Sequence, residues 1–441
     1  MRGRLTFGIA ALASVAVLAC ARKPNDGAVQ LRLWALGREG ELVQALTRDF
    51  ERENPRIRVD VQQIPWNAAH EKLLTGFVGE TSPDVAQLGN TWVPEFDALH
   101  SLLPLDSLVA SSETIHQKDF FPGIWDTNVL NGVTYGIPWY VDTRVIFYRK
   151  DLLKRAGVDS MPTTWRAWRT AMEKVRDSSG GKYAIFLPLN EWNQPVIFGM
   201  QAGSSLLKDN GTRGAFSDST FRRAFDFYIE MFRDKLAPPL GAQQMSNLYQ
   251  EMGRGLFAMY ISGPWQLGEF ANRLPPELQD QWATAPLPGP TGDTSGVSMA
   301  GGSSIVVFKS SPHRREAWKL VEYLSRPAVQ AQFYHLSGDL PPTYEAWRDT
   351  ALANNPRALA FKTQLERVRP LPKVPEWEQV AQKTLEYAER AIRGQMSNEA
   401  TLRALDVEVD KILEKRRWML NRGKVSSAAR AGEGRPTAGG R

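Results

Sequence analysis

Strands and helices alternate near the start of this 441-residue chain, and this alternation constrains the fold more than any other feature of the sequence. The segment VQLRLWAL is strand-like, and apolar residues then recur at helical spacing from Leu42 to Phe50. In RIRVDVQQI, apolar and polar residues alternate as in a half-buried strand. A second helical run, NAAHEKLLTGFVG, leads to the short strand DVAQL. This order predicts an α/β sheet with parallel pairing.

The same alternation resumes further along the chain and predicts a second lobe. VIFYRKDLLKRAG is typical of a strand that runs into a helix, and TTWRAWRTAMEKVRD predicts a helix capped by Thr163 or Thr164. Further strands are predicted for KYAIFLPL, GLFAMYIS and VSMAGGSSIVVFKSS, and further helices for TFRRAFDFYIEMFRDK and HRREAWKLVEYLS. The region from about Glu345 to Leu420 is mainly helical in pattern. We therefore expect two α/β lobes.

The first 19 residues have the order of a secretory signal. Arg2 and Arg4 come first, an uncharged stretch of residues 5–19 follows, and small residues precede Cys20. A membrane-spanning helix is the alternative, but it needs roughly 20 apolar residues and this run is shorter. We expect export, with Cys20, the only cysteine of the chain, at the processing site. Residues 20–28 would then form a polar tether ahead of the first strand.

The excess of positive charge is confined to the two ends of the chain. The formal net charge is +6, of which two charges lie in the signal and a net four in the tail after Leu420. The body from Cys20 to Leu420 is therefore neutral and gives no electrostatic case for binding nucleic acid. The basic tail, residues 421–441, lacks the apolar content to fold and is expected to be disordered.

Six of the 14 tryptophans stand at the ends of predicted strands, each beside polar residues or glycine. Ligands of open α/β sheets bind outside the carboxyl ends of the strands. A pyranose offers apolar C–H faces to an indole ring and hydroxyls to amides, carboxylates and guanidinium groups. Several rings favour an oligosaccharide over a monosaccharide, while core packing is the alternative role of each tryptophan. The six are Trp34, Trp66, Trp92, Trp139, Trp192 and Trp265.

The sequence contains no H-E-x-x-H, G-x-S-x-G or P-loop motif. Its five histidines never pair at metal-ligand spacing, so neither a metal nor a cofactor is predicted. One rival function stays open, because the carboxylates of a glycosidase are set by spatial separation and not by sequence spacing. The candidates for such a secreted glycoside hydrolase are Glu39, Asp142, Glu191 and Glu376.

Five segments together carry a resemblance to a known family: LRLWALGREGELVQALTRDFERENPRIRVDV, SPDVAQLGNTWVPEF, GVTYGIPWYVDTRVIFYRKDLL, GLFAMYISGPW and GGSSIVVFKSSPHRREAWKLVEYL. In this order they resemble the extracellular solute-binding proteins of bacterial ABC importers, in the sugar and oligosaccharide branch (family 1, maltose-binding-protein-like). The resemblance runs from about Val29 to Leu420. It implies a non-enzymatic monomer that captures a carbohydrate and delivers it to the permease subunits of an ABC transporter. A binder of a charged non-sugar solute, such as a polyamine or a peptide, is a further alternative.

The segment VLAC also resembles a bacterial lipobox, which implies that Cys20 is lipidated and becomes the mature N-terminus. An ordinary signal cut near an incidental cysteine is the alternative. Lipidation would anchor the exported protein at the outer face of the plasma membrane or in the periplasm of a bacterium.

The resemblance implies a periplasmic-binding-protein fold, with a ligand cleft between two lobes and several crossovers between them. The N-terminal lobe would comprise residues 29–143 and 303–344, and the C-terminal lobe residues 144–302 and 345–420. The crossovers near YVDTR and GGSS would serve as hinges.

The family's ligand contacts correspond to the strand ends of this sequence. Either Asp339 or Tyr344 could reach the cleft, and Trp377 is a further candidate for covering it. The ligand-binding residues that the resemblance implies are Trp34, Arg38, Glu39, Trp66, Asn90, Trp92, Trp139, Asp142, Trp192, Trp265 and Gly302.

Overall fold

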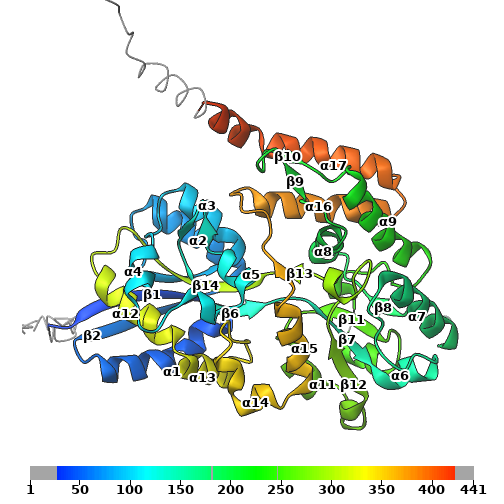
Figure 1. Ribbon diagram of the computed structural model, residues 1–441, viewed down its shortest axis with the longest axis horizontal. Coiled ribbons are helices and arrows are strands. Elements are labelled where there is room, and N and C mark those ends of the chain that lie inside the picture. The colour runs from blue at the N-terminus through cyan, green and yellow to red at the C-terminus, as the bar shows by residue number, and fades with distance from the viewer. Residues whose placement is uncertain (1–26, 180–181, 246, 423–441) are drawn as a thin grey trace, which may run out of the picture.

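The computed structural model describes residues 27–179, 182–245 and 247–422, which form two lobes, each built around its own β-sheet (Figure 1). The predicted signal, Cys20, most of the tether and nearly all of the basic tail lie outside these residues. The expectations for them remain predictions. None of the helices described is long and apolar enough to cross a membrane.

The first lobe contains a five-stranded sheet in the order β2-β1-β3-β14-β6. Strand β1 pairs in parallel with both β2 and β3, which confirms the predicted parallel pairing of the first three strands. Strand β14 runs antiparallel to β3 on one side and to β6 on the other, so the sheet as a whole is mixed. The strands are β1 (Val29–Leu36), β2 (Ile57–Ile64), β3 (Val85–Gly89), β6 (Ile137–Asp142) and β14 (Gly301–Val307).

Helices cover both faces of this sheet. The predicted helical stripe from Leu42 to Phe50 packs with the apolar faces of α12 and α13 on one face of the sheet, while α2 and α3 cover the other face. The main helices are α1 (Gly37–Glu53), α2 (Trp66–Val78), α12 (Arg314–Ser325) and α13 (Pro327–Ser337). Smaller elements of the lobe are η1 (Asn90–Trp92), α3 (Val93–Ala98), α4 (Asp106–Ser111), η2 (Gln117–Asp119), α5 (Pro122–Asp126), β4 (Val129–Leu130) and β5 (Val133–Thr134).

The second lobe contains a four-stranded sheet in the order β12-β7-β11-β8. Strand β7 is antiparallel to β11 and β12, and β8 is parallel to β11. The strands are β7 (Val145–Arg149), β8 (Ile185–Phe186), β11 (Met259–Ser262) and β12 (Trp282–Ala285).

Helices also enclose the second sheet. Helix α7 opens as predicted on a threonine cap, since the backbone N–H of Ala167 donates to Thr164 Oγ1 at 3.2 Å. The helices up to residue 281 are α6 (Lys150–Arg155), α7 (Trp165–Ser178), α8 (Asn193–Gln201), α9 (Ser219–Arg233), η3 (Ala242–Gln244), α10 (Leu248–Gly253), α11 (Gln266–Arg273) and η4 (Pro276–Gln281). A two-stranded ribbon joins β9 (Leu207–Lys208) to β10 (Arg213–Gly214).

The end of the chain is mainly helical, as the sequence predicts, and packs largely on the second lobe (Figure 1). The remaining elements are η5 (Asp293–Ser295), β13 (Ser298–Met299), η6 (Ala346–Arg348), α14 (Thr350–Ala353), α15 (Pro356–Leu365), β15 (Val368–Arg369), α16 (Trp377–Ile392) and α17 (Asn398–Ile412).

Two of the chain crossings between the lobes lie side by side. One joins β6 to β7, and the other enters β14, where Gly301 pairs with Asp142 and Gly302 with Val141. Gly302 has φ of 119°, and a Cβ at this position would lie 2.2 Å from the carbonyl oxygen of Tyr140. Only glycine allows the two crossing segments to approach this closely. These crossings form the back of the site described next.

Candidate ligand-binding cleft

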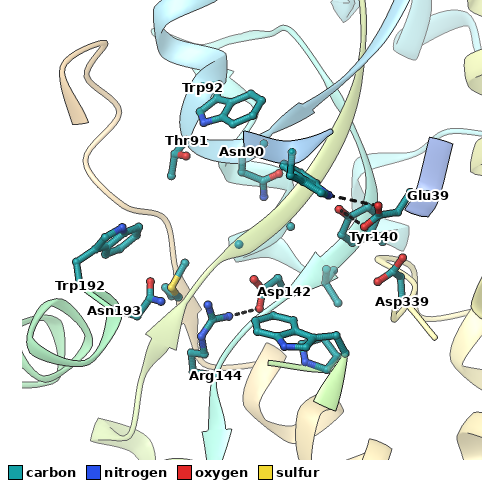
Figure 2. Close-up of a pocket in the computed structure, with 18 residues that line it drawn as sticks. Glu39, Asn90, Thr91, Trp92, Tyr140, Asp142, Arg144, Trp192, Asn193 and Asp339 are labelled. Carbon is teal, nitrogen blue, oxygen red and sulfur yellow. Dashed lines mark hydrogen bonds and ion pairs between the residues drawn. The ribbon is translucent and has the colours of Figure 1, made fainter. Parts of the chain in front are cut away.

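A cleft of about 480 Å³ lies between the two lobes, within the range of small-molecule sites (Figure 2). The carboxyl ends of β3 and β6 lie at this edge of the first sheet, together with the start of β14, which runs antiparallel to both. The segments before α8 and α11 face them from the second lobe. The lining residues are Glu39, Trp66, Gly89, Asn90, Thr91, Trp92, Tyr140, Val141, Asp142, Arg144, Trp192, Asn193, Pro264, Trp265, Met299, Gly301, Gly302 and Asp339.

Four indole rings line the cleft, two from each lobe. Trp66 and Trp92 of the first lobe meet edge to face at 5.8 Å between ring centroids. Trp192 of the second lobe is supported from behind by Trp377, which is fully buried and meets it edge to face at 5.9 Å. Trp66 and Trp265 are 38% and 45% exposed. Large exposed indoles in a concave site are available to contact a ligand.

Glycines make room for two of these rings. A Cβ at Gly37 would lie 2.4 Å from Cδ1 of Trp66, and a Cβ at Gly263 would lie 2.0 Å from Cζ3 of Trp265. Each indole therefore lies flush against backbone, which fixes the plane of the ring and leaves its outer surface open to the cleft.

An ion pair lies at the back of the cleft. The guanidinium of Arg144 donates to the carboxylate of Asp142 and lies over the ring of Trp265, 4.7 Å from its centroid. Burial lowers the pKa of Arg144, but the carboxylates of Asp142 and Glu191 outweigh it and hold the pKa above its ordinary value. The guanidinium is therefore a permanent cation, and its Nε has no hydrogen-bond partner in the unliganded protein.

A buried polar network holds Glu39 at the edge of the cleft. Tyr140 Oη donates to Glu39 Oε1 at 3.2 Å, and Trp66 Nε1 approaches Glu39 Oε2 at 3.3 Å. Behind Tyr140, Gln87 Nε2 donates to Tyr140 Oη and to Ser303 Oγ, both at 3.1 Å. Burial and the Glu39 carboxylate raise the pKa of Tyr140 well above its ordinary value. Tyr140 therefore stays a donor, and Glu39 keeps lone pairs for a ligand hydroxyl.

Asp339 enters the cleft from the segment after α13. Burial and, to a smaller extent, the carboxylates of Glu39 and Asp142 raise its pKa to about 7, against the opposite effects of Ser337 and Arg38. Near neutral pH this side chain therefore exchanges between a protonated donor and an ionised acceptor.

Asn90 offers the cleft an unpaired donor. Its Oδ1 accepts from Ser304 Oγ at 3.3 Å, but its Nδ2 has no partner in a side chain that is only 5% exposed. Figure 2 shows this amide directed toward the cleft. A buried amide N–H without a partner costs free energy that a ligand hydroxyl would recover. The neighbouring Thr91 donates instead to Glu378 of α16, which links the two lobes.

A second depression of about 840 Å³ continues from the cleft. The two share Glu39, Pro264, Trp265 and Asp339. Beyond Trp265 it extends along α11 and the end of α13, so the cleft and this depression form one groove.

Eight of the eleven residues expected at the site line the cleft together. Three do not. The strands extend past Trp34 and Trp139, so both lie within β1 and β6 as core residues, 7% and 3% exposed. Trp34 packs over Gly76, Trp139 stacks on Phe333 at 4.5 Å, and Arg38 lines the adjoining depression. The eight are Glu39, Trp66, Asn90, Trp92, Asp142, Trp192, Trp265 and Gly302.

The structure adds residues that the expected set omitted. Tyr140, Arg144 and Asn193 each stand within two residues of an expected residue in the sequence. That position is the sequence signal that could have identified them. Of the two open candidates, Asp339 lines the cleft, whereas Tyr344 packs on Phe121. Met299 and Pro264 carry no polar signal that could have singled them out. In the described part of the chain, no group of three or more His, Cys, Asp or Glu side chains could hold a metal ion.

Comparison with known proteins identifies this architecture. The family model described as bacterial extracellular solute-binding protein matches residues 34–331, more than half of the chain. The chain belongs to this family. Members of the family and the structural neighbours are binding proteins, and the fold is the two-lobed fold of these proteins.

Three of the similar proteins illustrate this likeness. The structure of the sugar-binding protein MalE from Xanthomonas citri is 49% identical, with a TM-score of 0.87, and covers 89% of this chain and 99% of its own. The diacetylchitobiose binding protein DasA of Streptomyces coelicolor is 24% identical over 335 residues, 75% of this chain and 76% of DasA. A lipoprotein of Streptomyces antibioticus is 26% identical over 398 residues, 86% of each chain.

Proposed function

We propose that this solute-binding protein captures a carbohydrate, an oligosaccharide in particular, and delivers it to the permease of a bacterial ABC importer. The observation that carries the proposal is the composition of the cleft. Four indole faces from the two lobes surround a polar set made of Asn90, Asp142, Arg144 and Glu39. Apolar sugar faces fit the indoles, and hydroxyls fit groups that donate and accept. The names of MalE and DasA support a sugar as the ligand.

Closure of the two lobes would complete the site. The proposed lobes are residues 29–143 with 303–344, and residues 144–302 with 345–420. Support comes from the two separate sheets and from the paired crossing at Asp142 and Gly301, where a small change in backbone angles would move one lobe against the other. A sugar held between indoles of both lobes favours the closed state, because only that state makes both sets of contacts.

Lipidation of Cys20 is proposed as the means of membrane attachment. The lipoprotein relative from Streptomyces antibioticus supports it. Cys20→Ala should abolish incorporation of radiolabelled fatty acid into the exported protein. Fatty-acid incorporation that persists in the Cys20→Ala variant would refute this attachment.

The ligand class is tested by thermal unfolding across a panel of mono- to hexasaccharides. A ligand at 100 times its Kd should stabilise the protein by about 2.7 kcal/mol. Trp92→Ala and Trp265→Ala should each weaken binding about fivefold or more, with unfolding of the unliganded protein little changed. The matched control is Trp418→Ala, since Trp418 is exposed and does not line the cleft. If no sugar shifts the unfolding midpoint, the ligand class is wrong.

The same panel tests the rival hydrolase. Of the four carboxylates expected for a hydrolase, Glu39 and Asp142 line the cleft, whereas Glu191 and Glu376 are not among its lining residues. Asp339 also lines the cleft, so paired carboxylates are present in a proposed sugar site. We expect intact sugars after overnight incubation with the protein. Cleavage of more sugar than there is protein would establish catalysis and overturn a purely binding role.

A further inference from the structure

The end of the described chain carries a run of exposed apolar side chains. Residues 414–422 form a helical stretch beyond α17, which projects from the second lobe as the dark red end of the chain in Figure 1. Trp418, Met419 and Leu420 in this stretch are 56%, 48% and 41% exposed. Among the eight large hydrophobic side chains that are exposed in the described residues, these are the only three adjacent in sequence. We name residues 414–422 the C-terminal tip.

The C-terminal tip is attached to the second lobe through Arg417, and its exposed apolar side chains, which form its apex, follow directly in the sequence. Arg417 donates to the backbone carbonyls of Thr212 and Asp410, at 2.7 and 3.0 Å, which ties the helix to the second lobe. Beyond it, three adjacent helical positions point about 100° apart. Trp418, Met419 and Leu420 therefore spread over about 200° of the helix and do not form one narrow stripe that the lobe could bury.

Basic residues flank this apolar apex in the sequence. The tip contains four basic residues, Lys415, Arg416, Arg417 and Arg422, and one acidic residue, Glu414. Arg422 lies over the ring of Trp418, with its guanidinium carbon 4.4 Å from the ring centroid. A strongly positive segment with an apolar centre is complementary to a surface that is anionic outside and apolar inside.

We propose that the C-terminal tip binds the surface of an anionic phospholipid bilayer. Trp418, Met419 and Leu420 enter the interfacial region, where tryptophan is favoured, and the flanking arginines and lysines contact the phosphates of the headgroups. The long basic side chains reach those phosphates while their methylene stems stay beside apolar groups. The tip would add a second attachment to the membrane, at the opposite end of the chain from Cys20.

A protein partner fits this surface less well than lipid. A stable protein interface buries about 800 Å² on each side with complementary shape. A projecting helix whose apolar groups spread over more than half of its circumference presents no such flat face, whereas a fluid bilayer adapts to side chains that point in several directions. This inference is independent of the ligand that the cleft binds.

The test is vesicle sedimentation of the full chain carrying Cys20→Ser, which removes the acylation site. The probes are vesicles of phosphatidylcholine alone and of phosphatidylcholine mixed with phosphatidylglycerol. We expect binding to the anionic vesicles only, weakened by added salt. The combined variant Trp418→Ala, Met419→Ala and Leu420→Ala should lower the partition coefficient about tenfold or more.

Two further variants separate lipid binding from a general surface effect. Val78→Ala removes another exposed apolar side chain, 81% exposed, and should leave vesicle binding unchanged. Arg422→Glu with Lys415→Glu should reduce binding to the level of neutral vesicles. Equal sedimentation of the parent and the triple-alanine variant would overturn the proposal. Concentration-dependent dimerisation that the triple variant abolishes, without vesicle binding, would overturn it in favour of a second copy of the chain.

Discussion

Replacing Asp339 by Asn should remove much of the pH dependence of stability of the unliganded protein. Burial beside Glu39 and Asp142 raises the pKa of Asp339 from 3.8 to about 7. Between pH 3.8 and about pH 7, the carboxyl group of Asp339 holds a proton in the folded protein and has released it in the unfolded chain. The stabilisation from this group is therefore complete below about pH 4 and is lost as the pH rises to about 7. At 1.36 kcal/mol for each pH unit, the loss is at most about 4 kcal/mol.

The assay is urea unfolding of the parent, Asp339→Asn and a control variant across pH 5 to 9, without ligand. Asn cannot ionise, so the variant should be more stable than the parent at pH 8 and should show a flatter pH profile. The control is Asp60→Asn on β2, an exposed carboxylate that should leave the profile unchanged. An identical fall in stability between pH 5 and 8 in the parent and in Asp339→Asn would refute the reasoning.

Three other changes test the rest of the site. Gly302→Ala should destabilise the fold by about 2 kcal/mol or more in urea unfolding, because the residue has positive φ and contacts the facing strand. Gly268→Ala in α11, with open space around it, should not destabilise the fold. Arg144→Met should cost about 1–3 kcal/mol by leaving the Asp142 carboxylate unpaired, and adding Asp142→Asn should restore part of that loss in a double-mutant cycle. Asn272→Ala, in the adjoining depression, should weaken binding only of the longer sugars by titration calorimetry, and equal weakening for short sugars would contradict a continuous groove.

The periodicity of the sequence was sufficient to predict most of the secondary structure. Helices α1, α2, α7, α9 and α12 lie where apolar residues recur at helical spacing, and β1, β2 and β3 pair in parallel as their order predicts. The antiparallel insertion of β14 between β3 and β6 could not be derived in this way. Its pairing joins residues more than 150 positions apart, as between Gly301 and Asp142, and local pattern carries no information about such distant contacts.

The candidate site shows the same division between local and distant information. Trp66 and Trp92 stand just beyond their strands and line the cleft, whereas Trp34 stands two residues before the end of β1 and is buried. A strand end that is misplaced by two residues therefore changes the role of a tryptophan, because residues within the strand pack into the core while those after it enter the cleft. Asp339 reaches the site from the segment after α13, far in sequence from Glu39.

The sequence by itself determined the alternation of strands and helices, the neutral body with basic ends, and the presence of indoles and polar residues near strand ends. Tertiary structure alone decided which of these residues meet. It paired Arg144 with Asp142, supported Trp192 with Trp377, and raised the pKa of Asp339. The physical reason is that periodicity and composition act along the chain, while burial, ion pairing and cavity shape depend on contacts between segments that only the folded chain brings together.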